Sequence, residues 1–154
     1  MKNFLQKMAL AIGCLLIMSC NKDQKLIGEI EGEYKIESVV NYSNGKGVAV
    51  SFTGGRIYFQ DCKMKDGFGG NCDGWYEFEG KPKVTLQYNV EKRGSKKVVR
   101  IYNLSNLNEP QIMGEFEFKM DGNDLILDGI EQSGSANGVV STYYSDVKLS
   151  RLQN

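Results

Sequence analysis

Few residues of this chain could carry out chemistry, because its 154 positions include no histidine. This excludes Ser-His-Asp and Cys-His arrangements and removes imidazole as a general base. Glu77 and Glu79 could serve a glycosidase, but their spacing puts both on one outer strand face, which favours a solvated pair. Asp66 to Gly74 is rich in glycine and oxygen ligands, yet lacks the alternating ligands and closing glutamate of an EF-hand. We therefore expect no enzyme, no metal site and no cofactor.

The beginning of the chain predicts a secretory signal. Lys2 and Lys7 precede an apolar run, Met8 to Met18, that is too short for a bilayer span of about 20 residues. Ile17-Met18-Ser19-Cys20 resembles the bacterial lipoprotein signal, in which an aliphatic residue stands three places before a cysteine and a small residue just before it. The resemblance implies that residues 1–19 are removed, that Cys20 carries lipid, and that the protein is anchored in the outer membrane of a Gram-negative envelope. Ordinary cleavage with a free Cys20 is the alternative.

Residues 20–31 are predicted to form a flexible tether, because the segment that follows Cys20 is polar and shows no periodicity. Lys22-Asp23 matches half of a pattern that resembles a surface-export signal, and Gln24 stands where a second acid would be expected. Both the periplasmic face and the cell surface therefore remain open.

The charge of the mature chain excludes some partners. After the signal, 17 basic residues stand against 19 acidic ones, a balance of −2. Nucleic-acid binding would call for a basic face, so we expect no such partner. The sequence contains no second long apolar run, which leaves the lipid as its predicted membrane attachment.

Cys62 and Cys72 are the two cysteines that remain once Cys14 leaves with the signal and Cys20 carries lipid. In an oxidising envelope compartment, an even pair inside one small domain predicts a disulfide. A metal or redox pair is the alternative, but two thiols without further ligands make a poor metal site.

Alternating apolar and polar residues recur from Gly32 to the end of the chain and predict short strands. The expected strands cover 34–42, 48–52, 56–62, 75–79, 84–90, 98–104, 112–120, 125–130 and 139–152. In the first of these, Tyr34, Ile36, Ser38, Val40 and Tyr42 are expected to share the buried face. Asn44-Gly45 is a typical hairpin dipeptide, and Ser133 to Gly138 is predicted as the last turn.

Eight or nine strands joined in sequence favour an all-β antiparallel meander over residues 32–154, closed into a barrel that leaves no free edges. A two-sheet sandwich is the alternative.

Ile30 to Ile36 resembles the opening strand of bacterial lipocalin-like domains, with Tyr34 in the place of their tryptophan. Thr142 to Leu152 looks like the family's closing strand, which often ends in Leu-x-Arg. The resemblance implies a barrel that binds a small apolar ligand or fills itself with side chains, and we expect Arg151 to lie on the Tyr34 ring.

The aromatic residues give the candidate binding positions. The row Val84, Leu86, Tyr88 and Val90 is expected to face Ile112, Phe116 and Phe118 inside the barrel. Tyr88, Phe116 and Phe118 are therefore the candidate ligand-binding residues, and Gly114 interrupts this row in a way that would leave space. If Tyr76 and Phe78 face the core, Trp75 points outward beside the cysteine loop as a contact for a protein or glycan.

Two functions follow from this pattern. The first is a lipid-anchored barrel that binds a small apolar or amphipathic molecule without chemistry. The alternative is a filled barrel that presents its loops to a protein or glycan partner, as an accessory subunit or inhibitor. The barrel interior discriminates between them, because ligand pockets usually enclose about 300–1,000 Å³.

Overall fold

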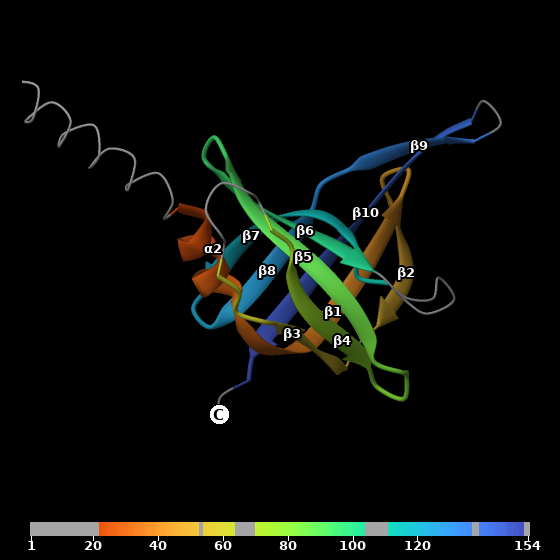
Figure 1. Cartoon of the computed structure of the whole chain (residues 1–154). Helices are drawn as coiled ribbons and strands as arrows, with labels where there is room; N and C mark the ends of the chain where they lie inside the picture. Colours follow the sequence, from red (N-terminus) through yellow and green to blue (C-terminus); the bar gives the residue numbers. More distant parts are fainter. Residues whose placement is uncertain (1–21, 53, 64–69, 104–110, 137–138, 153–154) are drawn as a thin grey trace, which may run out of the picture.

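Figure 1 shows the computed structural model of the chain, which describes residues 22–52, 54–63, 70–103, 111–136 and 139–152. The predicted signal and Cys20 lie outside the described residues, as does most of the predicted loop between Cys62 and Cys72. Within these ranges, no helix combines the length and apolar character that crossing a bilayer requires.

The described residues form one short helix and ten strands. The helix is α2 (Lys22–Ile30), and the strands are β1 (Gly32–Ser43), β2 (Lys46–Phe52), β3 (Gly55–Phe59), β4 (Cys72–Phe78), β5 (Val84–Arg93), β6 (Lys96–Asn103), β7 (Gly114–Asp121), β8 (Asp124–Gly129), β9 (Gln132–Ala136) and β10 (Val139–Arg151). Eight of them form a closed antiparallel barrel in the order β1-β3-β4-β5-β6-β7-β8-β10. The predicted closed meander is confirmed, and the chain does not form the alternative sandwich.

The first and last strands close the barrel, as predicted. β1 and β10 pair from Tyr34 opposite Arg151 to Ser43 opposite Tyr143. The β1–β2 hairpin turns where the sequence indicated. At the β1–β2 turn, Asn44 and Gly45 both have positive φ, 50° and 71°, which a two-residue hairpin turn of this twist requires.

β1 and β10 extend beyond the barrel, where they change partners. The far part of β1 pairs with β2, and the first part of β10 pairs with β9, so these four strands form a small sheet outside the barrel. Figure 1 shows the β9–β10 hairpin of this sheet projecting from the molecule. Gly129 ends β8 at this point, and a Cβ there would lie 2.3 Å from the carbonyl oxygen of Ser145 on β10. A side chain would separate the two backbones, so glycine permits the exchange.

Two details of the strand prediction were wrong. β1 has a bulge between Ile36 and Ser38, and the extra residue moves the following side chains to the opposite face. Val39 is therefore buried, while Val40 and Tyr42 point outward. The second error is β9, which occupies part of the predicted last turn. Its sequence has no β-branched or aromatic residue to indicate a strand.

Helix α2 corrects the prediction of a flexible tether. It presents Leu26, Ile27 and Ile30 on one face, and all three are buried in the same apolar cluster as the barrel interior. Asp23 in the first turn suits the positive end of the helix dipole. The helix is only nine residues long and contains Gly28. Packing on the barrel, and not the intrinsic helix propensity of this segment, must therefore stabilise it.

Candidate functional site

The three candidate ligand-binding residues face the barrel interior, as predicted. The exposed fractions of Tyr88, Phe116 and Phe118 are 0, 1 and 3%. A side chain that lined an internal space large enough for water would keep accessible surface toward that space. Phe59 makes edge-to-face contacts with Tyr34 and Tyr88, at centroid distances of 6.2 and 5.1 Å. These rings are therefore surrounded by other side chains and do not line a cavity.

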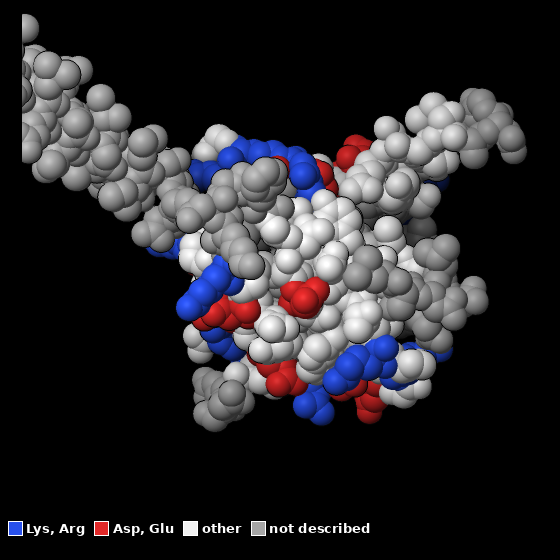
Figure 2. Space-filling view, in the orientation of Figure 1, with Lys and Arg blue, Asp and Glu red and all other residues white. Residues whose placement is uncertain are grey.

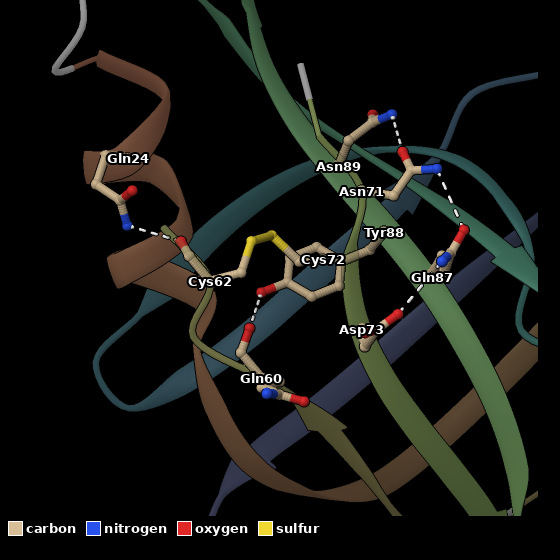
Figure 3. Close-up of a disulfide and its surroundings, with 9 residues drawn as sticks. All are labelled: Gln24, Gln60, Cys62, Asn71, Cys72, Asp73, Gln87, Tyr88 and Asn89. Atoms are coloured by element: carbon tan, nitrogen blue, oxygen red, sulfur yellow. Dashed lines mark hydrogen bonds between the residues drawn. A yellow bond between two sulfur atoms is a disulfide. The ribbon is translucent and has the colours of Figure 1, made fainter. Parts of the chain in front are cut away.

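One end of the barrel is closed by α2 and the cysteine pair (Figure 3). Cys62 and Cys72 form the predicted disulfide, with their Cα atoms 5.6 Å apart. Gln24 of α2 donates a hydrogen bond to the carbonyl of Cys62 at 3.0 Å, and Lys97 of β6 pairs with Glu29 of α2 at 2.6 Å. These polar contacts hold the helix on the barrel together with its apolar face.

Two buried tyrosines lie at the same end. The Tyr88 hydroxyl donates to the carbonyl of Gln60 at 2.6 Å. Burial, helped by the negative charge of Asp61, raises the pKa of Tyr88 well above its usual value. Burial also raises the pKa of Tyr34, against the opposing effect of the Arg151 guanidinium. Both phenols therefore stay neutral at any physiological pH and act as structural hydrogen-bonding groups.

Arg151 occupies the predicted position beside Tyr34. Its guanidinium carbon lies 5.0 Å from the ring centroid, and Nη2 donates hydrogen bonds to the Tyr34 hydroxyl and, at 3.1 Å, to the carbonyl of Glu29. One side chain of the last strand therefore contacts both the first strand and the helix.

A chain of polar side chains follows the outer face of β4 and β5, starting just before β4 (Figure 3). Asn89 donates to Asn71 at 3.1 Å, Asn71 donates to Gln87 at 3.3 Å, and Gln87 donates to Asp73 at 3.3 Å. Register explains the series, because Gln87 pairs with Asp73 across the two strands and alternate residues share a face. We call these four side chains the amide chain.

Two aromatic rings lie beside the amide chain. Trp75 points outward while Tyr76 and Phe78 are buried, as predicted. Its indole lies 6.0 Å from the ring of Tyr58 on β3, and the ammonium of Lys83 lies 3.8 Å over it. Gly74 of β4 allows the backbones of β3 and β4 to pack closely here, since a Cβ at this position would lie 2.4 Å from the carbonyl oxygen of Tyr58.

A charged network borders the amide chain on β5, β6 and β7. Arg100 pairs with both Glu91 and Glu115, and Arg93 pairs with the same two carboxylates. Hydrogen bonds from Arg93 and then Arg100 lower the pKa of Glu115, although partial burial opposes them. The network covers the outward-facing Val98, which has no exposed surface. Because the arginines and glutamates of this network already pair with one another, the network favours a structural role.

Two hollows lie on the outside of the barrel wall. One of about 520 Å³ lies between β1, β3 and β4, where Arg56 pairs with Glu33 and Glu77. The other, of about 380 Å³, lies beside Gly114 and is lined in part by the exposed Tyr102 and Met113. The space predicted at Gly114 is thus on the surface and not in the interior.

The carboxylates of Glu77 and Glu79 lie in different surroundings. Glu77 lies 3.9 Å from Arg56, and Glu79 is exposed in the turn that follows β4. Within the described ranges, no three His, Cys, Asp or Glu side chains come together as a metal site would require.

The comparisons with known proteins gave no match. No protein-family model, no curated protein and no solved structure matches this chain. Of the residues predicted to bind a ligand or contact a partner, Tyr88, Phe116 and Phe118 are buried and Trp75 lies on the outer face. The amide chain was missed because strand register, which brings its members together, is not legible in the sequence.

Proposed function

We propose that the mature chain is a lipid-anchored, non-catalytic binding module that recognises its partner with the outside of a filled barrel. The observation that carries this proposal is the closed interior. Tyr34, Phe59, Tyr76, Tyr88 and Phe116 all have at most 1% exposure, so a ligand would have to displace packed side chains to enter among them. This favours the interaction-protein alternative over the apolar carrier.

The sequence supports the anchor and the structure suggests how the barrel would sit. Ile17 to Cys20 carries the lipoprotein-like motif, and only Asn21 separates Cys20 from the first residue of α2. Because α2 packs on the barrel, the lipid would hold this end of the barrel close to an envelope membrane instead of on a long tether. The outer face of β4 and β5 would then be displayed at the side of the barrel.

Two features support a role without chemistry. The chain has no histidine, and the arginine–glutamate contacts described above already neutralise Glu77, Glu91 and Glu115. The lipocalin-like resemblance of the two end strands brings no catalytic residue with it.

The test is titration of the purified mature protein with fluorescent fatty-acid and polyaromatic probes. We expect no saturable binding below about 100 µM. Phe116→Ala provides the matched positive control, because removing this ring should open a space and create probe binding. Saturable one-to-one binding to the unmodified protein that Phe116→Trp weakens would overturn the proposal in favour of an apolar carrier.

A further inference from the structure

The amide chain has unused hydrogen-bonding capacity that faces outward. Within the chain, Asn71 and Gln87 each donate one hydrogen bond and accept one. A primary amide has two N–H groups and two carbonyl lone pairs, so each can make one further bond of each kind. A hydroxyl group needs this combination, because it both donates and accepts. Asp73 adds a carboxylate, which is a strong acceptor for hydroxyl protons.

The amide chain is also held in place before any ligand arrives. Each side chain from Asn89 to Asp73 is oriented by its neighbour, and Asn71 lies next to the Cys62–Cys72 disulfide. A ligand that binds here does not have to order these side chains, which reduces the unfavourable entropy of binding.

Trp75 supplies an apolar surface within reach of the same ligand. It pairs with Thr85, and Gln87 lies two residues further along β5, so the Cα atoms of Trp75 and Gln87 are roughly 8 Å apart from sheet spacing alone. The ring face carries negative charge density and attracts positively polarised groups. Lys83 occupies that position now, and it is an exposed residue that can move aside. The C–H groups of a sugar ring have the same polarity.

The charge of the face selects the ligand class. Figure 2 shows the surface over β4 and β5 as largely uncharged, with an isolated acidic residue near its middle. Arg100, at its border, is already paired with Glu91 and Glu115. Arg93, at the same border, pairs with the same two carboxylates, so these two guanidinium groups do not favour an anionic polymer. A protein partner would need a contiguous apolar centre, but the side chains between Trp75 and Tyr102 are polar.

From these observations we infer that the outer face of β4 and β5 binds a neutral, hydroxyl-rich glycan chain. Trp75 stacks on a sugar ring, and Asn71, Gln87 and Asp73 hydrogen-bond its hydroxyls. This inference rests on the proposed function, in which the outside of the barrel is the recognition surface.

The experiment is affinity electrophoresis of the full mature protein in native gels that contain soluble neutral glucans, mannans or xylans. We expect retardation in at least one neutral polysaccharide. Trp75→Ala should weaken binding about tenfold, and Gln87→Ala about fivefold.

Tyr143→Ala is the matched control, because this tyrosine is 52% exposed on the projecting sheet, away from the amide chain. It should bind like the unmodified protein. Unchanged far-ultraviolet circular dichroism and melting temperature in Gln87→Ala show that its loss of binding is local.

Several results would overturn the inference. These are no retardation by any neutral polysaccharide, equal retardation of the Trp75 and Gln87 variants and the unmodified protein, or stronger binding to anionic polygalacturonate that Lys83→Ala abolishes. A photoreactive amino acid at Thr85 that captures a protein in intact cells, without glycan binding, would also overturn it. That outcome would leave the proposed function standing, whereas saturable probe binding inside the barrel would remove the proposed function itself.

Discussion

Replacing Arg151 by alanine tests how the barrel is closed. Arg151 is the last residue of β10, and its guanidinium contacts the Tyr34 ring and hydroxyl on β1 and the Glu29 carbonyl on α2. The substitution removes all three contacts at once. It also leaves the hydroxyl of Tyr34, a fully buried residue, without its donor.

The expected loss of stability is large for a single side chain. A cation above an aromatic ring contributes ~0.5–2 kcal/mol, and a hydrogen bond that involves a charged group contributes ~1.5–3 kcal/mol. Arg151 is itself partly buried and the contacts share one side chain, so their contributions are not additive. We expect Arg151→Ala to lower the free energy of unfolding by ~3–4 kcal/mol, which corresponds to a fall of roughly 9–15 °C in melting temperature for a domain of this size.

Urea unfolding followed by Trp75 fluorescence would measure this effect, with Tyr34→Phe as the matched variant that removes the hydroxyl alone. In a double-mutant cycle, Arg151→Ala and Tyr34→Phe should couple by ~1–2 kcal/mol, because they share the hydrogen bond. A loss below ~1 kcal/mol in Arg151→Ala, or additive effects of the two substitutions, would show that Arg151 does not join the first and last strands as described.

The other predictions concern single features. Replacing Cys62 and Cys72 together by alanine should cost ~2–3 kcal/mol in urea unfolding, because their separation is ten residues; an unchanged midpoint would contradict this. Ile27→Ala should cost ~2–4 kcal/mol through loss of core packing, whereas a loosely attached helix would show almost none. Stability should fall as pH rises above about 10, because the raised pKa of Tyr88 lets the unfolded chain ionise first. Tyr88→Phe should flatten that dependence, and an equally steep fall in the variant would exclude this cause. Cys20→Ala should move the protein from the detergent phase to the aqueous phase in phase separation, and unchanged partition would exclude the lipid anchor.

Local patterns were sufficient to predict the barrel. Alternation in β5 and β7 identified the inward rows around Tyr88 and Phe116, and Asn44-Gly45 identified a hairpin whose dihedral angles require these residues. The likeness of the two ends to opening and closing strands indicated the pair of β1 with β10. In each case the sequence signal that predicts the structure lies within a few neighbouring residues, or in the alternation of buried and exposed side chains along a strand.

The misses were features that depend on distant contacts. The bulge after Ile36 depends on how β1 pairs with β10, and no residue type in β1 indicates it. Helix α2 is stabilised by the barrel end that it covers, so its short sequence alone looked polar and irregular. The amide chain needs Asp73 and Gln87 on neighbouring strands in one register. Sequence patterns could predict that Trp75 points outward, but not the residues around it.

The closure by first and last strands has a consequence for the order of folding. Tyr34 and Arg151 are 117 residues apart in sequence, and joining ends so distant carries a loop-closure entropy of ~4 kcal/mol. Each hairpin between β3 and β8 can form from residues already near one another, so closure comes late and relatively slowly. Until β10 has been synthesised and has paired, β1 keeps an exposed strand edge, and a partly made chain is open to wrong pairing with its neighbours.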